Sequence, residues 1–261
     1  MTAELDHVVV VVSALAEAMS RFRGAGFTVV PGGRHEGLPT ENALVVFADG
    51  SYLELLATLD PDSRRSLREL RGPAGGERWE RHLHGSSALA RRFLPSLAGP
   101  DGVSDWALRV ERLDRLAAES RRRGDVMTGP VALGRERPDG ARLDMRLLFP
   151  AERWMPFLIE DRSPRALRIP DDAASRTHAN GARGIGRVSA LAGDVAGAAL
   201  ACVDRMDARV ASREDGAAEV AFGAVRLELL PGGPPGACGA ALAGVRALPP
   251  ELTALGLTPG G

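Results

Sequence analysis

The sequence contains no lysine, and all 33 of its basic residues other than histidine are arginines. Without lysine, a chain cannot form a lysine Schiff base, cannot anchor pyridoxal phosphate and cannot build a P-loop. There is no GxSxG or HExxH motif, and the glycines at 181, 184 and 186 precede a predicted strand, whereas those of a Rossmann motif follow one. We therefore expect no pyridoxal and no nucleotide cofactor.

Cysteine and long apolar runs are also scarce. Cys202 and Cys238 form no CxxC pair, and the first residues (MTAELD) carry acids where a secretory leader carries bases. The apolar run at 8–12 is interrupted at Ser13, far short of a membrane span. The formal net charge of −1 gives no general attraction to nucleic acid or anionic lipid. These absences predict a cytoplasmic protein with free thiols that binds neither nucleic acid nor membranes.

A repeated phrase is the most informative feature that is present. Residues 51–56 read SYLELL and residues 225–230 read VRLELL, and each closes a segment that opens with a Val-, Leu- or Ala-rich strand. A more divergent copy opens at 104–110 (SDWALRV) and closes at 156–161 (PFLIED). Internal repetition of this kind indicates that one structural unit is used several times.

The first copy shows the order of elements within the unit. Its valine run is typical of a buried strand, and the apolar residues between 14 and 23 recur at helical spacing before a glycine stop. Three short strands follow, so the unit reads β-α-β-β-β. We expect an α+β protein whose parts are paired modules at 4–57 and 104–161, a helical connector at 61–97, a linker at 163–184, and a third module with a C-terminal tail at 185–261.

Taken together, these segments resemble one known family. LDHVVVVVSAL, FTVVPGGRH, ENALVVFADGSYLELLA, SDWALRV, LLFP and PFLIED are similar to the glyoxalase-like branch of the vicinal-oxygen-chelate superfamily. The resemblance implies paired βαβββ modules whose curved mixed sheets form a cup that often holds a divalent metal. It implies no single reaction, because the superfamily includes isomerases, lyases, epimerases, ring-cleaving dioxygenases, thiol transferases and metal-free resistance proteins.

The resemblance also implies where metal ligands would lie: at the third residue of the opening strand motif and at the closing glutamate of each paired module. The first module places His7 and Glu54 at these positions, and the second places Trp106 and Glu160 there. Tryptophan cannot bind a metal. His7, Glu54 and Glu160 would remain as an open N/O/O set, suited to Zn, Fe, Mn, Co or Ni.

Each of these three residues also has a plainer interpretation. His7 can be a half-buried histidine bonded to a carbonyl, and Glu160 can be the first polar residue after a strand. Glu54 can be solvated on a sheet edge. Its neighbours Leu53 and Leu55 favour the cup, because the carboxylate must then leave the apolar face.

Five further side chains are candidates for the cup. Glu41 stands where relatives often carry histidine, and a carboxylate there can act as catalytic base. Asn42 begins a strand that is expected to face the cup. Trp106 can stack on a planar ligand or simply belong to the core, and Arg146 can contact an anionic substrate. His178 lies in the linker, which can cover the mouth of the cup, although exposure on a loop is the plainer interpretation.

Two classes of function fit this pattern. The first is a small-molecule enzyme of lyase or isomerase type, in which a metal, or Glu54 with His7 in its absence, moves a proton next to a carbonyl. The second is a metal-free protein that binds or sequesters an apolar or aromatic metabolite. The third module has Arg187 and Glu228 in the ligand positions, a pair that would fill its cup. Its uncovered sheet edge predicts a homodimer through this module.

Overall fold

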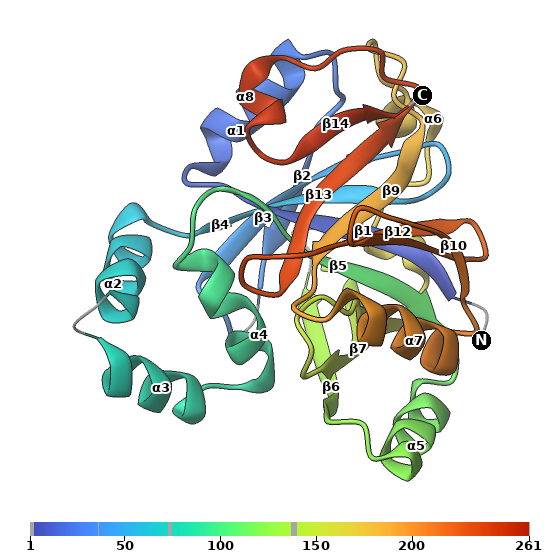
Figure 1. The fold of residues 1–261 in the computed structure, drawn as a ribbon. Helices are drawn as coiled ribbons and strands as arrows, with labels where there is room; N and C mark the ends of the chain where they lie inside the picture. The colour runs from blue at the N-terminus through green and yellow to red at the C-terminus, as the bar shows by residue number, and fades with distance from the viewer. Residues whose placement is uncertain (1–2, 36, 73–74, 137–139, 261) are drawn as a thin grey trace.

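The computed structural model describes residues 3–35, 37–72, 75–136 and 140–260. Two mixed sheets pack against each other, and a lobe of three helices lies to one side of them (Figure 1). No helix in these ranges is long and apolar enough to cross a membrane. The predicted α+β fold, with βαβββ modules and curved mixed sheets, is confirmed.

The first two modules form one eight-stranded sheet, called sheet A here, in the order β2-β3-β4-β1-β5-β8-β7-β6. Its centre is the antiparallel pair β1 and β5, so one module lies on each side of this ladder. The elements of the first module are β1 (Ala3–Val11), α1 (Leu15–Gly24), β2 (Val30–Arg34), β3 (Thr40–Val46) and β4 (Tyr52–Thr58). Those of the second are β5 (Gly102–Val110), α5 (Leu113–Arg123), β6 (Met127–Glu136), β7 (Arg142–Pro150) and β8 (Phe157–Asp161).

The remaining strands form a six-stranded sheet B, in the order β10-β11-β12-β9-β13-β14. Its third βαβββ module consists of β9 (Gly184–Leu191), α7 (Val195–Met206), β10 (Arg209–Glu214), β11 (Ala217–Phe222) and β12 (Val225–Leu230). The tail adds β13 (Gly236–Ala243), the short α8 (Pro250–Thr253) and β14 (Leu257–Gly260).

The C-terminal tail covers the sheet edge on which the predicted homodimer depends. Strand β13 pairs antiparallel with β9, as β5 pairs with β1, and β14 runs parallel to β13 as β8 does to β5. The edge that was expected to be free for a second chain is therefore covered by the same chain. The homodimer stays a prediction, now without support from that edge.

The connector between the first two modules folds into α2 (Pro61–Arg71), α3 (Gly76–Gly85) and α4 (Ala88–Leu97), which form the lobe in Figure 1. Two arginines hold the lobe in place, one within it and one against sheet A. Arg64 of α2 donates to the carbonyls of Leu97 and Gly99 at 3.0 and 2.9 Å. Arg92 of α4 grips the carboxylate of Asp105 on β5 through two hydrogen bonds of 2.7 and 2.8 Å. Helix α4 is thereby held as a wall over one face of sheet A.

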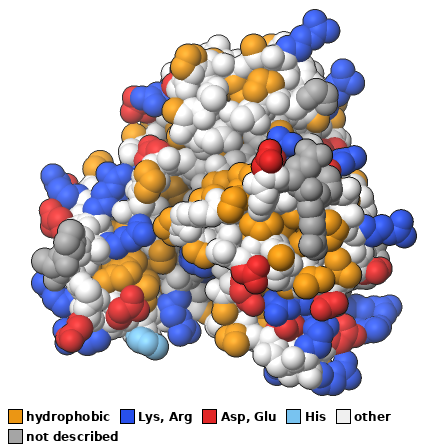
Figure 2. Space-filling model, viewed as in Figure 1, with side chains coloured by type: hydrophobic (Ala, Val, Ile, Leu, Met, Phe, Trp, Pro, Cys, Tyr) orange, Lys and Arg blue, Asp and Glu red, His pale blue; other side chains and the backbone are white. Residues whose placement is uncertain are grey.

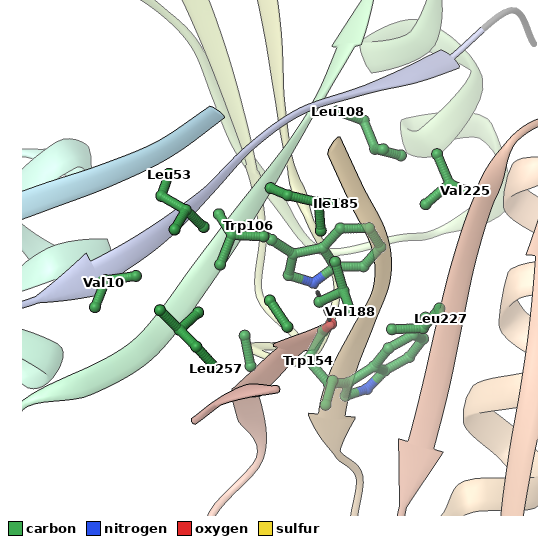
Figure 3. Packing of buried hydrophobic residues seen from close by; sticks show 14 of the residues in the cluster. Val10, Leu53, Trp106, Leu108, Trp154, Ile185, Val188, Val225, Leu227 and Leu257 are labelled. Carbon is green, nitrogen blue, oxygen red and sulfur yellow. Dashed lines mark hydrogen bonds between the residues drawn. The ribbon is translucent and has the colours of Figure 1, made fainter. Parts of the chain in front are cut away.

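Alternation along the strands divides the core into two parts. Val8 and Val10 of β1 point to a cluster between the two sheets, while Val9 and Val11 point to a second cluster beneath α3 and α4. Figure 3 shows the first cluster, with Trp106 at its centre beside Val188 of β9. We call the face of sheet A that carries the second cluster the cup face.

The surface is evenly charged. In the view of Figure 2, acidic and basic side chains surround the periphery, and hydrophobic side chains gather near the centre over the strands of sheet B. The linker after the second module contains the 3-10 turn η1 (Arg165–Leu167) and the short α6 (Ala173–Arg176).

Candidate active site

His7 and Glu54 meet on the cup face, as the sequence predicted. Strands β1 and β4 are parallel neighbours, with His7 beside Tyr52 and Val9 beside Glu54. Because side chains alternate between the two faces of a sheet, these positions point to the same side. Nε2 of His7 lies 3.4 Å from Oε2 of Glu54.

His7 is held between two carboxylates. Its Nδ1–H donates to Oδ1 of Asp6 at 2.7 Å, and its ring stacks on Tyr52 with 4.6 Å between the ring centroids. Burial by itself would lower the pKa of His7, but Asp6 and Glu54 outweigh burial and raise that pKa above the ordinary value. The protonated imidazole is therefore favoured. Its buried Nε2 makes no hydrogen bond within the protein.

Glu54 is held in turn by three side chains. Its Oε1 accepts a 2.5 Å hydrogen bond from the amide of Asn42 and lies 3.4 Å from Nε2 of His35. Burial would raise the pKa of Glu54, but His35 and His7 outweigh it and hold this pKa well below the usual range. The carboxylate is therefore ionised at neutral pH. The backbone N–H of Gly33 donates to the Asn42 carbonyl at 2.8 Å, which fixes which end of the amide faces Glu54.

His35 is the site residue that sequence reasoning missed. It follows β2 directly, and its Nδ1 lies 3.0 Å from Oγ1 of Thr40. Strand β2 pairs antiparallel with β3, which brings the end of β2 opposite the start of β3. The available signal was therefore a histidine at a hairpin end facing the strand of Asn42.

Behind His7 lies a buried network that fixes its orientation. Asp6 is fully buried and accepts two hydrogen bonds from Arg168, of 2.8 and 3.0 Å. Arg168 also donates to the hydroxyl of Tyr52 at 2.8 Å and to the carboxylate of Asp161. Although burial would raise the pKa of Asp6, Arg168 and His7 hold it well below its usual range. An ionised Asp6 requires the proton of His7 to sit on Nδ1.

The site opens into a cavity on the cup face. The volume open to the centres of water-sized molecules is about 70 Å³. The polar side chains that the structure describes in its lining come from the first module and the linker: His7, His35, Asn42, Tyr52, Glu54 and Arg168. The second module contributes Leu133, Gly134, Met145, Leu147, Phe157 and Ile159, and α4 contributes Leu89 and Phe93. The cavity therefore has one polar end and one apolar end.

Trp106 and Glu160 do not face this cavity, and their predicted roles in the cup are wrong. Trp106 is fully buried between the sheets, where its Nε1–H donates to the carbonyl of Trp154 at 3.0 Å (Figure 3). Glu160 lies on the same side of sheet A, where Oε1 accepts from the backbone N–H of Leu113 at 3.2 Å and caps α5. A shift of one residue in a strand reverses the face that a side chain occupies.

The true counterparts in the second module follow from the β1–β5 ladder. This ladder is symmetric about its centre, with one bulge on each strand, and Asp105 stands in β5 as His7 stands in β1. On the outer neighbours, Phe157 of β8 takes the place that Glu54 has on β4. Asp105 is 1% exposed and is fully engaged by Arg92.

Three other predicted residues also lie away from the cavity. Glu41 alternates with Asn42 and so points to the face of β3 that is turned away from the cup. Arg146 also lies on the face of sheet A that is turned away from the cup, where it pairs with Asp114 of α5. His178 accepts a 3.0 Å hydrogen bond from the N–H of Thr28 and lies 3.0 Å from the carbonyl of Val46. Burial lowers the pKa of His178. It is a neutral, buried structural residue and not part of a lid, so the predicted roles of these three residues are corrected.

The donor set does not fit the metal site that the superfamily resemblance implies. That site takes ligands from both modules, but Phe157 offers no ligand atom and Asp105 is already paired with an arginine. Within the part of the chain that the structure describes, no three His, Cys, Asp or Glu side chains are grouped to hold an ion. His7 and Glu54 lie close together, but Glu160 cannot complete the predicted set.

The third module repeats the geometry of the first in altered form. Glu228 lies beside Ser189 on the neighbouring strand, as Glu54 lies beside Val9. Its Oε2 accepts a 2.6 Å hydrogen bond from Ser189 and lies 3.7 Å from Nε of Arg187. The Arg–Glu pair expected from the sequence is thus present.

This chain is similar to known proteins in sequence and in fold. The model of the glyoxalase-like domain family matches residues 5–203. A hypothetical protein from Staphylococcus aureus is similar in structure, with a TM-score of 0.71 and 14% identity over 94% of this chain and 92% of that chain. A triple mutant of 4-hydroxymandelate synthase from Streptomyces coelicolor has a TM-score of 0.50 and 14% identity, covering 92% of this chain and 71% of that one.

A third structure, methylmalonyl-CoA epimerase from Mycobacterium tuberculosis, has a TM-score of 0.40 and 18% identity, covering 63% of this chain and 91% of that chain. A search of the curated proteins finds no match. At 14% identity, the structures with TM-scores of 0.71 and 0.50 establish the likeness of fold alone.

Proposed function

Because this chain belongs to the glyoxalase-like domain family, we propose that it is an enzyme that moves a proton at a carbon next to a carbonyl group of a small molecule. Isomerisation, epimerisation and elimination all begin with this step. The observation that carries the proposal is the pairing of the His7 imidazole with the Glu54 carboxylate at 3.4 Å, at the polar end of a cavity.

Glu54 is the proposed base. It is ionised, buried and oriented by Asn42, and it removes the proton from the carbon next to the carbonyl. Its lowered pKa makes it a weak base. The reaction therefore depends on strong stabilisation of the negative charge that develops on the carbonyl oxygen.

His7 is the proposed source of that stabilisation. Its Nε2 faces Oε2 of Glu54 at 3.4 Å but makes no hydrogen bond to any residue that the structure describes, and the carboxylates on either side favour its protonated form. Nε2–H would donate a hydrogen bond to the carbonyl oxygen as the enolate forms. Glu54 then returns the proton to the carbon from which it came, which completes the exchange. In a hydroxyketone, Glu54 can instead deliver the proton to the former carbonyl carbon while the neighbouring hydroxyl proton passes to the oxygen held by His7, which gives the isomer. The apolar wall beneath α4 keeps bulk water from the intermediate.

This mechanism uses the side chains of His7 and Glu54 and no divalent metal. The experiment that tests the proposal is proton exchange in deuterium oxide, followed by proton NMR on a panel of small ketones, hydroxyketones and 2-oxoacids. We expect the wild-type protein to accelerate exchange at the carbon next to the carbonyl for at least one class, and the Glu54→Gln variant to lose this acceleration. Exchange that is no faster than in buffer for every class would contradict the proposal.

A metal-free binding or sequestering protein is the second candidate. The largely apolar lining of the cavity favours it. In that case the wild-type protein would bind members of the panel without accelerating exchange, and Glu54→Gln would bind them equally well. A cytoplasmic location and a homodimer remain proposals that neither candidate requires.

A further inference from the structure

The two ends of the cavity differ in the kind of ligand group that they can hold. Leu133, Met145 and Leu147 of the second module face the polar residues of the first across the hollow, and Phe93 of α4 closes the side. Among the side chains of the second module that the structure describes, those in the lining are apolar. Hydroxyl or phosphate groups placed at this end would lose their hydration without gaining partners, which is costly. The body of a ligand at this end must therefore be apolar.

The charged side chains at the polar end are already paired with one another. The imidazole of His7 sits between the carboxylates of Asp6 and Glu54. Arg168 is bonded to Asp6 and Asp161 and has no charge to spare for a ligand. A carboxylate ligand would lie beside the ionised Glu54, and a cation would find no free counter-ion. An uncharged oxygen that accepts a hydrogen bond from His7 fits this end best.

The size of the cavity limits the ligand as well. Its volume of about 70 Å³ is about half of the roughly 150 Å³ of an engineered protein cavity that admits benzene, so a ligand of about six non-hydrogen atoms fills it and reaches its open side. The walls are held in place, since Arg92 ties α4 to β5 through a buried double hydrogen bond. The body of a large conjugate would have to lie outside it, beyond the open side.

From these three observations we propose that the site takes small, uncharged aliphatic ketones and aldehydes, with the carbonyl at His7 and a branched or short alkyl group against Leu133, Met145 and Leu147. The inference rests on the proposed function, because that function identifies the carbonyl as the group held at the polar end. It goes further by assigning the ligand's charge, polarity and size.

Three probes with the same number of non-hydrogen atoms test the proposal. They are 3-methyl-2-butanone, which is an uncharged branched ketone, isobutyrate, which carries a charge, and dihydroxyacetone, which is polar at both ends. Labelling the methionine methyl groups with carbon-13 gives a local reporter, because Met145 lines the cavity while Met206 lies in the core between the sheets. The Met145 signal is assigned with a Met145→Leu variant.

We expect the ketone to shift the Met145 signal saturably and to bind at least about tenfold more tightly than the other two probes. Met206 should not move. Leu133→Asn should weaken ketone binding about tenfold, whereas Leu200→Asn, on the exposed face of α7, should leave it unchanged. Tighter binding of isobutyrate or dihydroxyacetone would overturn the proposal, as would the absence of any Met145 shift with the ketone at about 50 mM.

The two proposals fail in different ways. If the ketone binds as expected but the wild-type protein accelerates exchange for no compound, the ligand class stands and the enzymatic function fails. If exchange is accelerated for dihydroxyacetone or a 2-oxoacid and not for the ketone, the function stands and the ligand class is wrong.

Discussion

Nε2 of His7 lies 3.4 Å from Oε2 of Glu54. The two residues stand on the parallel neighbouring strands β1 and β4, which are separated in the sequence by α1, β2 and β3. Each group shifts the pKa of the other in the direction that favours an ion pair: that of His7 is raised and that of Glu54 is lowered. The pair therefore links the stability of the fold to the state of the site.

This linkage predicts how stability depends on pH. A histidine with a raised folded-state pKa contributes stability that is fully present below its unfolded pKa of about 6.5 and is lost as the pH rises through the folded pKa. The unfolding free energy of the wild-type protein should therefore contain a component that falls over this window. Urea unfolding at a series of pH values between about 5.5 and 9 measures it. The His7→Gln variant should lack this component, and an unchanged slope in the variant would rule out the linkage.

Asp6 is expected to control both the tautomer and the basicity of His7. In Asp6→Asn the negative charge that faces Nδ1 is lost, so the pKa of His7 should fall relative to the wild-type protein. Exchange activity should drop about tenfold or more, because the charged donor is less populated. NMR titration of the His7 ring protons reports the pKa directly. Asp194→Asn, which retains a helix-capping side chain on α7, is the matched control; equal titration of His7 in both variants would contradict the role of Asp6.

The attachment of the helical lobe to sheet A, and with it the stability of the fold, should depend on the ion pair between Arg92 and Asp105. Their side chains are 4% and 1% exposed. Arg92→Met leaves a buried carboxylate without its partner and should lower the unfolding free energy by about 3–5 kcal/mol. Arg226→Met, which breaks an exposed pair with Glu219, should cost about 0.5 kcal/mol or less. Denaturant titration compares the two variants. Adding Asp105→Leu to Arg92→Met should recover part of the loss, and failure to do so would locate the cost in the carbonyls that Arg92 also binds.

Metal content is the next test, because the second module supplies Phe157 and an already paired Asp105 at the positions symmetric to Glu54 and His7. We expect purified protein to contain less than one equivalent of any divalent metal, and exchange activity to survive dialysis against a chelator. Elemental analysis of the wild-type protein and of His7→Ala decides this. One equivalent of metal that is lost in His7→Ala would show that the first module alone builds a metal site.

The positions of His7 and Glu54 in the first module were predictable because the sequence patterns of the two strands agree with each other. The valine run fixed β1, and a glutamate between two leucines in β4 had to turn away from the apolar face, so His7 and Glu54 could be placed in one hollow. Asn42 was expected next to a strand that faces the cup, and in the structure its amide reaches Glu54 there.

The cup residues of the second module were predicted wrongly because its sequence, compared with that of the first module, suggests an incorrect alignment. Asp105–Trp106 looks like Asp6–His7, but the bulges on β1 and β5 shift the ladder so that Trp106 matches Val8 and packs between the sheets. The acid at the end of β8 belongs to a helix cap, not to the cup. Nor did the sequence reveal that the tail would supply β13, because its glycine- and alanine-rich strand carries little hydrophobic signal.

The most direct test of the account compares two buried or half-buried glutamates, one on each face of sheet A. In the deuterium exchange assay, Glu54→Gln should reduce the rate at least about 100-fold, because it removes the base, while Glu160→Gln, which keeps the oxygen that caps α5, should stay within about twofold of the wild-type rate. Equal rates in the two variants, or a larger loss in Glu160→Gln, would contradict the assignment of the site to His7 and Glu54.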